Sequence, residues 1–212
     1  MNVQPLDRPP VVGFIHEPEG EAIGGLVLTH GAGANCGSEL LVKLAAELAG
    51  VGWAVLRCDL PFRQKRRFGP PSPAQAPADQ EGLRAALREM RSRIQGPVFL
   101  GGHSYGGRQA SIVAAESGKE LAGLLLLSYP LHPPGKAEQL RTAHFKGIET
   151  SCLFLHGTAD PFASPDEMKT ATALIPAKTK LLFLEGVGHD LGKGKTEIVS
   201  RIAEEFKRFA AL

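Results

Sequence analysis

A serine between glycines is the residue of this sequence whose type and setting most clearly indicate chemistry. Ser104 lies in the run GGHSYGG at residues 101–107, after the apolar run 98–102 and before a segment, 108–116, that can form a helix. A strand, a sharp turn and a helix in this order hold a serine hydroxyl above the edge of a sheet, where it can act as a nucleophile. Gly102 and Gly106 would remove collisions with the neighbouring strand and helix. We therefore predict that Ser104 is a nucleophile.

A serine nucleophile needs a base, and His189 is the candidate. It follows the predicted strand 180–184 in the run GVGH, and no other histidine lies beyond residue 156. In one known arrangement of these three groups, the nucleophile comes first in the chain, the acid second and the histidine last, on a loop after the last strand. His189 has this position. We expect His103 to be structural, His30 and His156 to bond loop backbone, and His16 to lie at the surface. His132 and His144 are expected in solvated loops, with the alternative that either lines the substrate pocket.

The base needs a carboxylate to orient it and to stabilise its charged form. Asp160 follows the apolar run 152–156 directly, at the end of a predicted strand, and is the predicted acid. Asp166 and Glu167 are expected in the first turn of a capped helix, and this position accounts for both acidic residues without a catalytic role. Glu185 could support the site by contacting one of its residues. Asp190 is a weaker candidate for the acid because it is adjacent to His189 in the sequence.

Small residues after the first buried strand predict an oxyanion hole. The run THGAGAN at residues 29–35 lets the backbone approach a ligand closely. Its main-chain N–H would act together with that of Tyr105, the residue after the nucleophile. We predict Ala32 as the donor, with Gly33 as the second choice. A phosphate-binding loop is excluded because no Gly-Lys-Ser/Thr follows.

Apolar runs alternate with amphipathic segments along the chain. Seven runs predict strands, at residues 11–16, 25–30, 53–58, 98–102, 121–128, 152–156 and 180–184. Most are continuously apolar, which is typical of parallel strands covered on both faces. The pattern predicts an α/β fold, a mostly parallel, doubly wound sheet with helices on both faces, in a single domain over residues 1–212.

The helices and loops complete this prediction. Asp79 is expected to cap a helix with an apolar stripe from Leu83 to Ile94, and residues 164–167 form a capping box. Residues 198–209 predict a last amphipathic helix. The segments 60–78 and 130–150 are expected as loops, and the second is too short for a large lid.

Composition narrows the classes of function. The 212 residues carry 24 Lys+Arg and 22 Asp+Glu, so a net charge of +2 gives no argument for a nucleic-acid partner. Three scattered cysteines are too few for a disulfide framework. The opening residues 1–10 carry an acid, three prolines and no apolar segment, which argues against a signal peptide, and no apolar run is long enough for a membrane span. We expect a cytoplasmic protein that has no membrane partner and needs no metal or organic cofactor.

Four ordered motifs, HGAGA, GGHSYGG, LHGTADPF and GVGHDL, resemble those of the α/β-hydrolase superfamily. The combination is most similar to its small dienelactone-hydrolase-like branch, which includes proteins of the testis-expressed protein 30 and NSL-complex subunit 3 type. The run RCDLPFR at residues 57–63 also resembles this subgroup. Dienelactone hydrolases use a cysteine nucleophile where Ser104 stands here, so the resemblance implies the fold without implying that substrate.

Together these features predict a serine hydrolase that cleaves a small ester or thioester through an acyl-serine. Arg63, Arg66 and Arg67 would emerge at the same sheet edge as the nucleophile and are candidate residues of the substrate mouth. The alternative explanation of these arginines is a charged, solvated loop. The alternative function is a catalytically silent scaffold for protein or nucleic-acid interaction, which the basic loop favours.

Overall fold

A single eight-stranded sheet organises the computed structural model, which describes residues 1–211 and, for residue 119, the backbone alone. The strands lie in the order β1-β2-β4-β3-β5-β6-β7-β8. The β1–β2 and β2–β4 pairs are antiparallel, and all other pairs are parallel. The bounds are β1 (Asn2–Arg8), β2 (Val11–Glu17), β3 (Gly24–Thr29), β4 (Trp53–Asp59), β5 (Val98–His103), β6 (Gly123–Leu127), β7 (Cys152–Gly157) and β8 (Thr179–Leu184).

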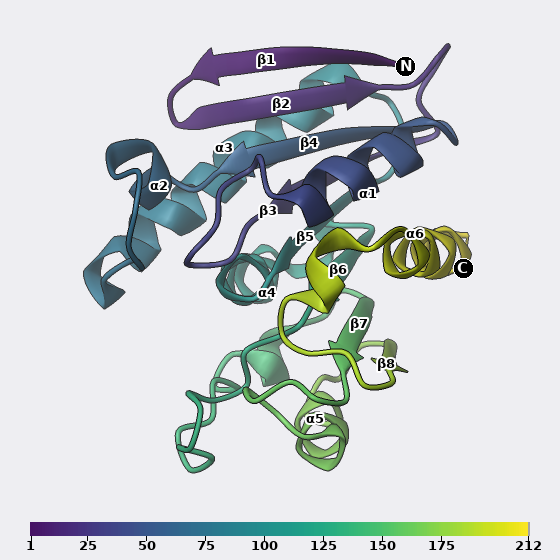
Figure 1. The fold of residues 1–212 in the computed structure, drawn as a ribbon. Helices are drawn as coiled ribbons and strands as arrows, with labels where there is room; N and C mark the ends of the chain where they lie inside the picture. Colours follow the sequence, from purple (N-terminus) through teal and green to yellow (C-terminus); the bar gives the residue numbers. More distant parts are fainter. Residues whose placement is uncertain (212) are drawn as a thin grey trace.

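Helices cover both faces of the sheet (Figure 1). The α-helices are α1 (Glu39–Ala49), α2 (Pro61–Lys65), α3 (Ala76–Arg93), α4 (Tyr105–Ser117), α5 (Pro165–Thr172) and α6 (Thr196–Ala210). Short 3₁₀ turns are η1 (Pro73–Gln75), η2 (Gly118–Glu120), η3 (Phe145–Gly147) and η4 (Leu191–Gly194). Apolar side chains of α1 and α6 form the core on one face, and those of α3, α4 and α5 form it on the other. The predicted doubly wound fold is confirmed.

Two cores explain why the strands are continuously apolar. In β3, Leu26 and Leu28 point into the core beneath α1 and α6, whereas Val27 points into the opposite core. Successive strand side chains face opposite sides of a sheet, so a strand covered on both sides needs apolar residues at every position. The seven predicted strands accordingly begin and end within two residues of the observed ones.

Strand β1 was not predicted. It lies at the edge of the sheet, and only Leu6 of its seven residues is buried. Polar residues and Pro5 interrupt any apolar pattern, and proline is tolerated at such a sheet edge. Its pairing with β2 therefore left no hydrophobic signal in the sequence.

Two polar residues and one loop differ from the predictions. Helix α3 begins three residues before Asp79, which lies fully buried inside the helix and does not cap it. His16 is also buried, and its Nε2 accepts a hydrogen bond of 2.7 Å from Nε of Arg57. The segment 60–78 contains α2 and η1 and is not wholly a loop.

Two helix predictions are confirmed. The side chains of Ser164 and Glu167 form the predicted capping box at the start of α5. The apolar stripe of α6, which includes Ile198, Ile202 and Phe206, is buried against α1 and the sheet. No helix among residues 1–211 is both long and apolar enough to cross a bilayer.

Candidate functional site

Three side chains from distant parts of the chain meet at the carboxyl ends of the parallel strands. Ser104 follows β5, Asp160 lies in the turn after β7, and His189 lies in the loop after β8. Ser104 Oγ is 2.7 Å from His189 Nε2, and His189 Nδ1 is 2.8 Å from Asp160 Oδ2. The structure thus joins the predicted nucleophile, base and acid in one hydrogen-bonded chain.

The turn that carries Ser104 is strained and closely packed. Ser104 has φ 52° and ψ −119°, a conformation that a residue with a side chain rarely adopts. A Cβ at Gly102 would lie 2.7 Å from the Gly106 carbonyl carbon, and one at Gly106 would lie 2.6 Å from the His30 carbonyl oxygen. Both glycines let the start of α4 approach its neighbours closely enough to hold the serine at the sheet edge.

The Asp160 carboxylate is held in its ionised form. Asp160 is 5% exposed, and burial alone would raise its pKa. Hydrogen bonds from His189 and from the Phe162 N–H outweigh burial, so the pKa of Asp160 lies below its usual value. Asp190 instead accepts from the Gly192 N–H, and Glu185 is exposed. Asp160 is therefore the carboxylate that faces the imidazole.

Two neighbouring rings fix the position of His189. His103 Nε2 donates to the His189 carbonyl oxygen over 2.7 Å. The Phe162 ring lies 4.2 Å from the His189 ring, tilted by 32°. Burial lowers the pKa of His103 to about 4, so this ring is neutral at neutral pH. His103 is a structural partner of the His189 loop, as the sequence predicted.

The loop that contains Ala32 is held in place by Arg63. The Arg63 guanidinium donates to the carbonyl oxygens of Ala32 at 2.7 Å and Ala34 at 2.8 Å, and also to those of Arg66 and Gly69. Within residues 1–211, the N–H groups of Ala32 and Tyr105 donate to no protein acceptor. Both residues line the same cavity as Ser104.

A buried carboxylate ties the elements around Tyr105 together. Asp79 Oδ2 accepts from the Tyr105 hydroxyl at 2.7 Å, and its Oδ1 accepts from the Phe62 N–H at 2.9 Å. Burial raises the pKa of Asp79 in spite of these hydrogen bonds. The contact connects α3 with α2 and with the first residue of α4.

A cavity of about 390 Å³ opens beside Ser104. Ala32, Ser104 and Tyr105 line it, and most of its other lining residues are small or apolar. The wall includes Pro70, Pro71, Pro73, Ala76, Pro130 and Phe162. Its charged lining residues are Arg108 and Arg141, and no acidic residue lines it within the described chain. The cavity has room for a small organic substrate.

The basic residues predicted at the substrate mouth are not among the residues that line the cavity. Arg63 is buried with its guanidinium on backbone carbonyls, so the prediction that it faces substrate is wrong. Arg66 is exposed and donates to the Pro70 carbonyl of its own loop. Arg67 is exposed, with its guanidinium carbon 5.4 Å from the centroid of the Phe68 ring. The prolines of this segment line the cavity, and these three arginines do not.

The remaining histidines lie outside the cavity. His30 and His156 bond the carbonyls of Gly31 and Ala163, each at 2.9 Å, in line with the structural role expected. His132 is buried, and half-buried His144 lies 2.7 Å from Ser111 Oγ, so the prediction of solvated loops is wrong.

Sequence reasoning missed Arg108 and Arg141 as lining residues. Arg108 lies four residues after Ser104 in α4, so the helical repeat alone places it on the same side of the helix. Arg141 had no comparable signal, because it belongs to the irregular segment between β6 and β7.

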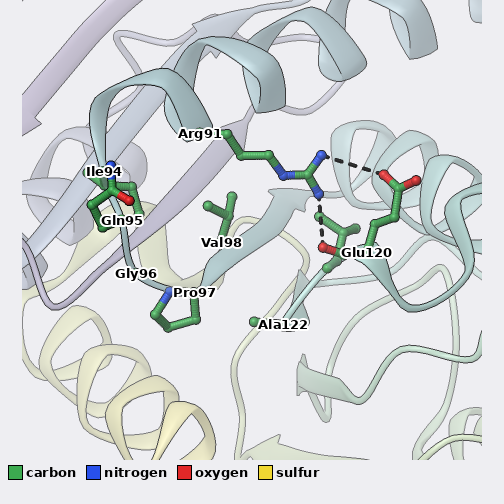
Figure 2. Close-up of a pocket in the computed structure, with 9 residues that line it drawn as sticks. Arg91, Ile94, Gln95, Gly96, Pro97, Val98, Glu120 and Ala122 are labelled. Carbon is green, nitrogen blue, oxygen red and sulfur yellow. Dashed lines mark hydrogen bonds and ion pairs between the residues drawn. The ribbon is translucent and has the colours of Figure 1, made fainter.

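A second hollow, of about 450 Å³, lies at the opposite end of β5 (Figure 2). Arg91 spans it and bonds Glu120, with Arg91 Nη2 2.9 Å from the Glu120 carbonyl oxygen. Because Val98 begins β5 and Ser104 follows it, this hollow is separated from Ser104 by the length of the strand. Within the described residues, no group of three or more His, Cys, Asp or Glu side chains is arranged to hold a metal ion.

Comparisons with solved structures agree on the fold. An alpha-beta serine hydrolase homologue from Coxiella burnetii is 18% identical with a TM-score of 0.75, and the match covers 96% of each chain. A dienelactone hydrolase from Anabaena variabilis is 17% identical with a TM-score of 0.74, covering 93% of this chain and 89% of that one. A serine hydrolase without a lid from Xanthomonas campestris is 16% identical with a TM-score of 0.73, covering 98% and 94%.

A family match covers most of the sequence. The model of the family described as an alpha/beta hydrolase domain matches residues 23–211. This range contains every strand from β3 to β8 and all three residues of the hydrogen-bonded chain. The chain therefore belongs to the α/β-hydrolase family, in agreement with the resemblance of its four motifs.

Proposed function

We propose that this protein is a serine hydrolase that cleaves a small ester or thioester through an acyl-serine intermediate. The observation that carries the proposal is the continuous contact from Ser104 Oγ, which lines a cavity, through His189 to the ionised Asp160. Nucleophile, base and orienting acid at hydrogen-bond distances are the arrangement that acyl transfer requires.

In the first half of the reaction, His189 Nε2 takes the Ser104 proton as Oγ attacks the carbonyl carbon. Asp160 accepts from His189 Nδ1, so it holds the ring in the tautomer that leaves Nε2 free to act as a base. The N–H groups of Tyr105 and Ala32 stabilise the negative oxygen of the tetrahedral intermediate. His189 then gives the proton to the departing alcohol or thiol.

In the second half, a water molecule replaces the leaving group. His189 removes a proton from this water as its oxygen attacks the acyl carbon, and then returns the proton to Ser104 Oγ. The cavity wall beside Ser104 comes from residues 70–76 and 130–141 and from Phe162, so a small acyl group fits without a separate lid.

A fluorophosphonate probe tests the nucleophile. We expect the wild-type protein to be labelled and Ser104→Ala to show no labelling, because only an activated serine reacts with this probe. Ser92→Ala is the matched control, since Ser92 lies exposed on α3, where its hydroxyl donates to the Glu89 carbonyl. A panel of 4-nitrophenyl esters and acyl thioesters would then identify the leaving group.

Two results would contradict the proposal. Wild-type protein that remains unlabelled and hydrolyses no ester or thioester would favour the scaffold alternative. Labelling that persists in Ser104→Ala would place the reactive group at another residue.

A further inference from the structure

We propose that Arg108 and Arg141 form an anion site in the cavity, and that the substrate ester or thioester carries a carboxylate. The inference rests on the proposed function and specifies its substrate class. The two guanidinium groups are the charged groups of a lining that is otherwise small, apolar or hydroxylic.

The position of Arg108 connects the anion site to the nucleophile. It follows Ser104 by one turn of α4, a rise of about 6 Å along the helix axis. Its Nε is buried and has no hydrogen-bond partner among the residues that the structure describes. A buried polar group without a partner is costly, and a bound carboxylate oxygen would satisfy it.

Arg141 is anchored by its backbone and by part of its side chain. Its N–H donates to the Leu131 carbonyl at 2.8 Å, and its own carbonyl accepts from the Tyr129 hydroxyl at 2.7 Å. Its Nη1 donates to the Pro130 carbonyl at 3.1 Å. Within residues 1–211, Nε and Nη2 of Arg141 have no protein acceptor, so one edge of the guanidinium remains available to a ligand.

No protein carboxylate neutralises this pair in the described part of the chain. Other arginines of the protein form ion pairs, such as Arg84 with Glu116 and Arg91 with Glu120, but Arg108 and Arg141 form none there. Burial and the nearby charge of Arg108 both lower the pKa of Arg141. Two like charges left together beside an apolar wall favour an anionic ligand, because a bound anion offsets their repulsion.

Two alternatives for the anion are separated by the choice of substrates. A carboxylate on the acyl group is represented by mono-4-nitrophenyl adipate, whose matched neutral ester is 4-nitrophenyl hexanoate. A carboxylate on the leaving group is represented by the acetate ester of 5-hydroxy-2-nitrobenzoic acid, with 4-nitrophenyl acetate as the neutral counterpart. In each pair, the measured quantity is the ratio of kcat/KM for the charged ester to that for the neutral one.

We expect wild-type protein to prefer the charged ester of at least one pair by about tenfold or more, the size of one hydrogen bond to a charged group. Arg141→Gln and Arg108→Gln should each lower this ratio about tenfold. Arg141→Lys should lie between wild type and Arg141→Gln, because it keeps the charge but loses the planar fork. Arg91→Gln is the matched control, since it removes a charge at the opposite end of β5 (Figure 2) and should leave the ratio unchanged.

Each outcome bears on one proposal or the other. Neutral esters hydrolysed as fast as charged ones, or a preference that survives both arginine substitutions, would overturn the anion site and leave the serine hydrolase intact. No hydrolysis of any ester, together with no fluorophosphonate labelling of wild type, would overturn the proposed function itself. Because the readout is a ratio within one variant, partial unfolding lowers both rates equally and does not imitate loss of the anion site.

Discussion

Arg63 is a basic residue whose guanidinium lies inside the protein, bound to carbonyl oxygens of the chain itself. Its bonds to Ala32 and Ala34 fix the loop that carries Ala32, which lines the cavity together with Ser104. Oxyanion stabilisation depends on donors that are already in place before the reaction, since no energy is then spent on reorganising them. We therefore regard Arg63 as a positioning residue that acts through Ala32 and does not touch the substrate.

Replacing Arg63 with glutamine should lower kcat while KM changes little. Removing one oxyanion donor costs roughly 100- to 1000-fold in kcat, so for a donor that is only misplaced we expect a loss of at least about tenfold. Steady-state kinetics on one 4-nitrophenyl ester measure the effect. Lys65→Gln, which removes an exposed charge from the same short helix α2, is the control and should retain the wild-type kcat. A rise in KM with kcat preserved would instead indicate that Arg63 contacts substrate.

The sequence predicted some residues of the site because their positions follow from strand ends alone. Ser104, Asp160 and His189 each follow a parallel strand, and the carboxyl ends of parallel strands lie at one edge of the sheet. Asp79 and His16 were misjudged because their burial depends on partners from other segments, Tyr105 for one and Arg57 for the other. No periodic pattern in the sequence encodes such pairings.

At the scale of elements, the approach of α4 to the end of β3 depends on Gly106. A Cβ added there would lie 2.6 Å from the His30 carbonyl oxygen, which is backbone and cannot rotate away. The start of α4 or the loop after β3 would have to move, and both carry groups that face the cavity.

Gly106→Ala should lower the free energy of unfolding and slow fluorophosphonate labelling. Overpacking costs about 1–3 kcal/mol. Alanine gains up to about 1 kcal/mol in helix propensity, so the expected net effect is destabilising. Urea denaturation and the labelling rate measure the two effects. Gly147→Ala is the control, because its nearest contacts are at 3.5 and 3.6 Å, which is ordinary packing. A variant as stable and as reactive as wild type would show that this contact is not restrictive.

Elements were predictable from the sequence where burial is uniform along them. The apolar runs of β3 to β8 reflect two cores that cover both faces of the sheet. By contrast, β1 is exposed along most of its length, and α2 has five residues in a segment rich in proline and arginine. Short or exposed elements owe their conformation to pairing and packing with other segments, so their own sequence carries little signal.

For the whole molecule, buried histidines make stability depend on pH. Burial lowers the pKa values of His16, His103 and His144 to about 4, whereas the unfolded chain has the ordinary value of 6.5. Between pH 6.5 and 4, the unfolded state therefore binds more protons than the folded state. Stability is fully present above pH 6.5 and is lost as the pH falls toward 4.

The free energy of unfolding should fall on acidification by up to about 1.4 kcal/mol per pH unit for each of these histidines. Urea denaturation at pH 7.5, 6.5, 5.5 and 4.5 measures the slope. His144→Gln should make the slope shallower by the share of one histidine, even if the variant is less stable at pH 7.5. Equal stability at pH 7.5 and 5, or the same slope in His144→Gln, would contradict this explanation.

The walls of the cavity and the groups that face the reacting bond come from different stretches of chain. Ser104, Asp160 and His189 lie just beyond the carboxyl ends of parallel strands, whereas most of the wall comes from residues within 70–76 and 130–141, outside the sheet. Randomising those two stretches in a combinatorial library should therefore yield variants with altered acyl-chain preference that still turn over. In this architecture, evolution can change which substrate the cavity accepts while keeping the residues that cleave it.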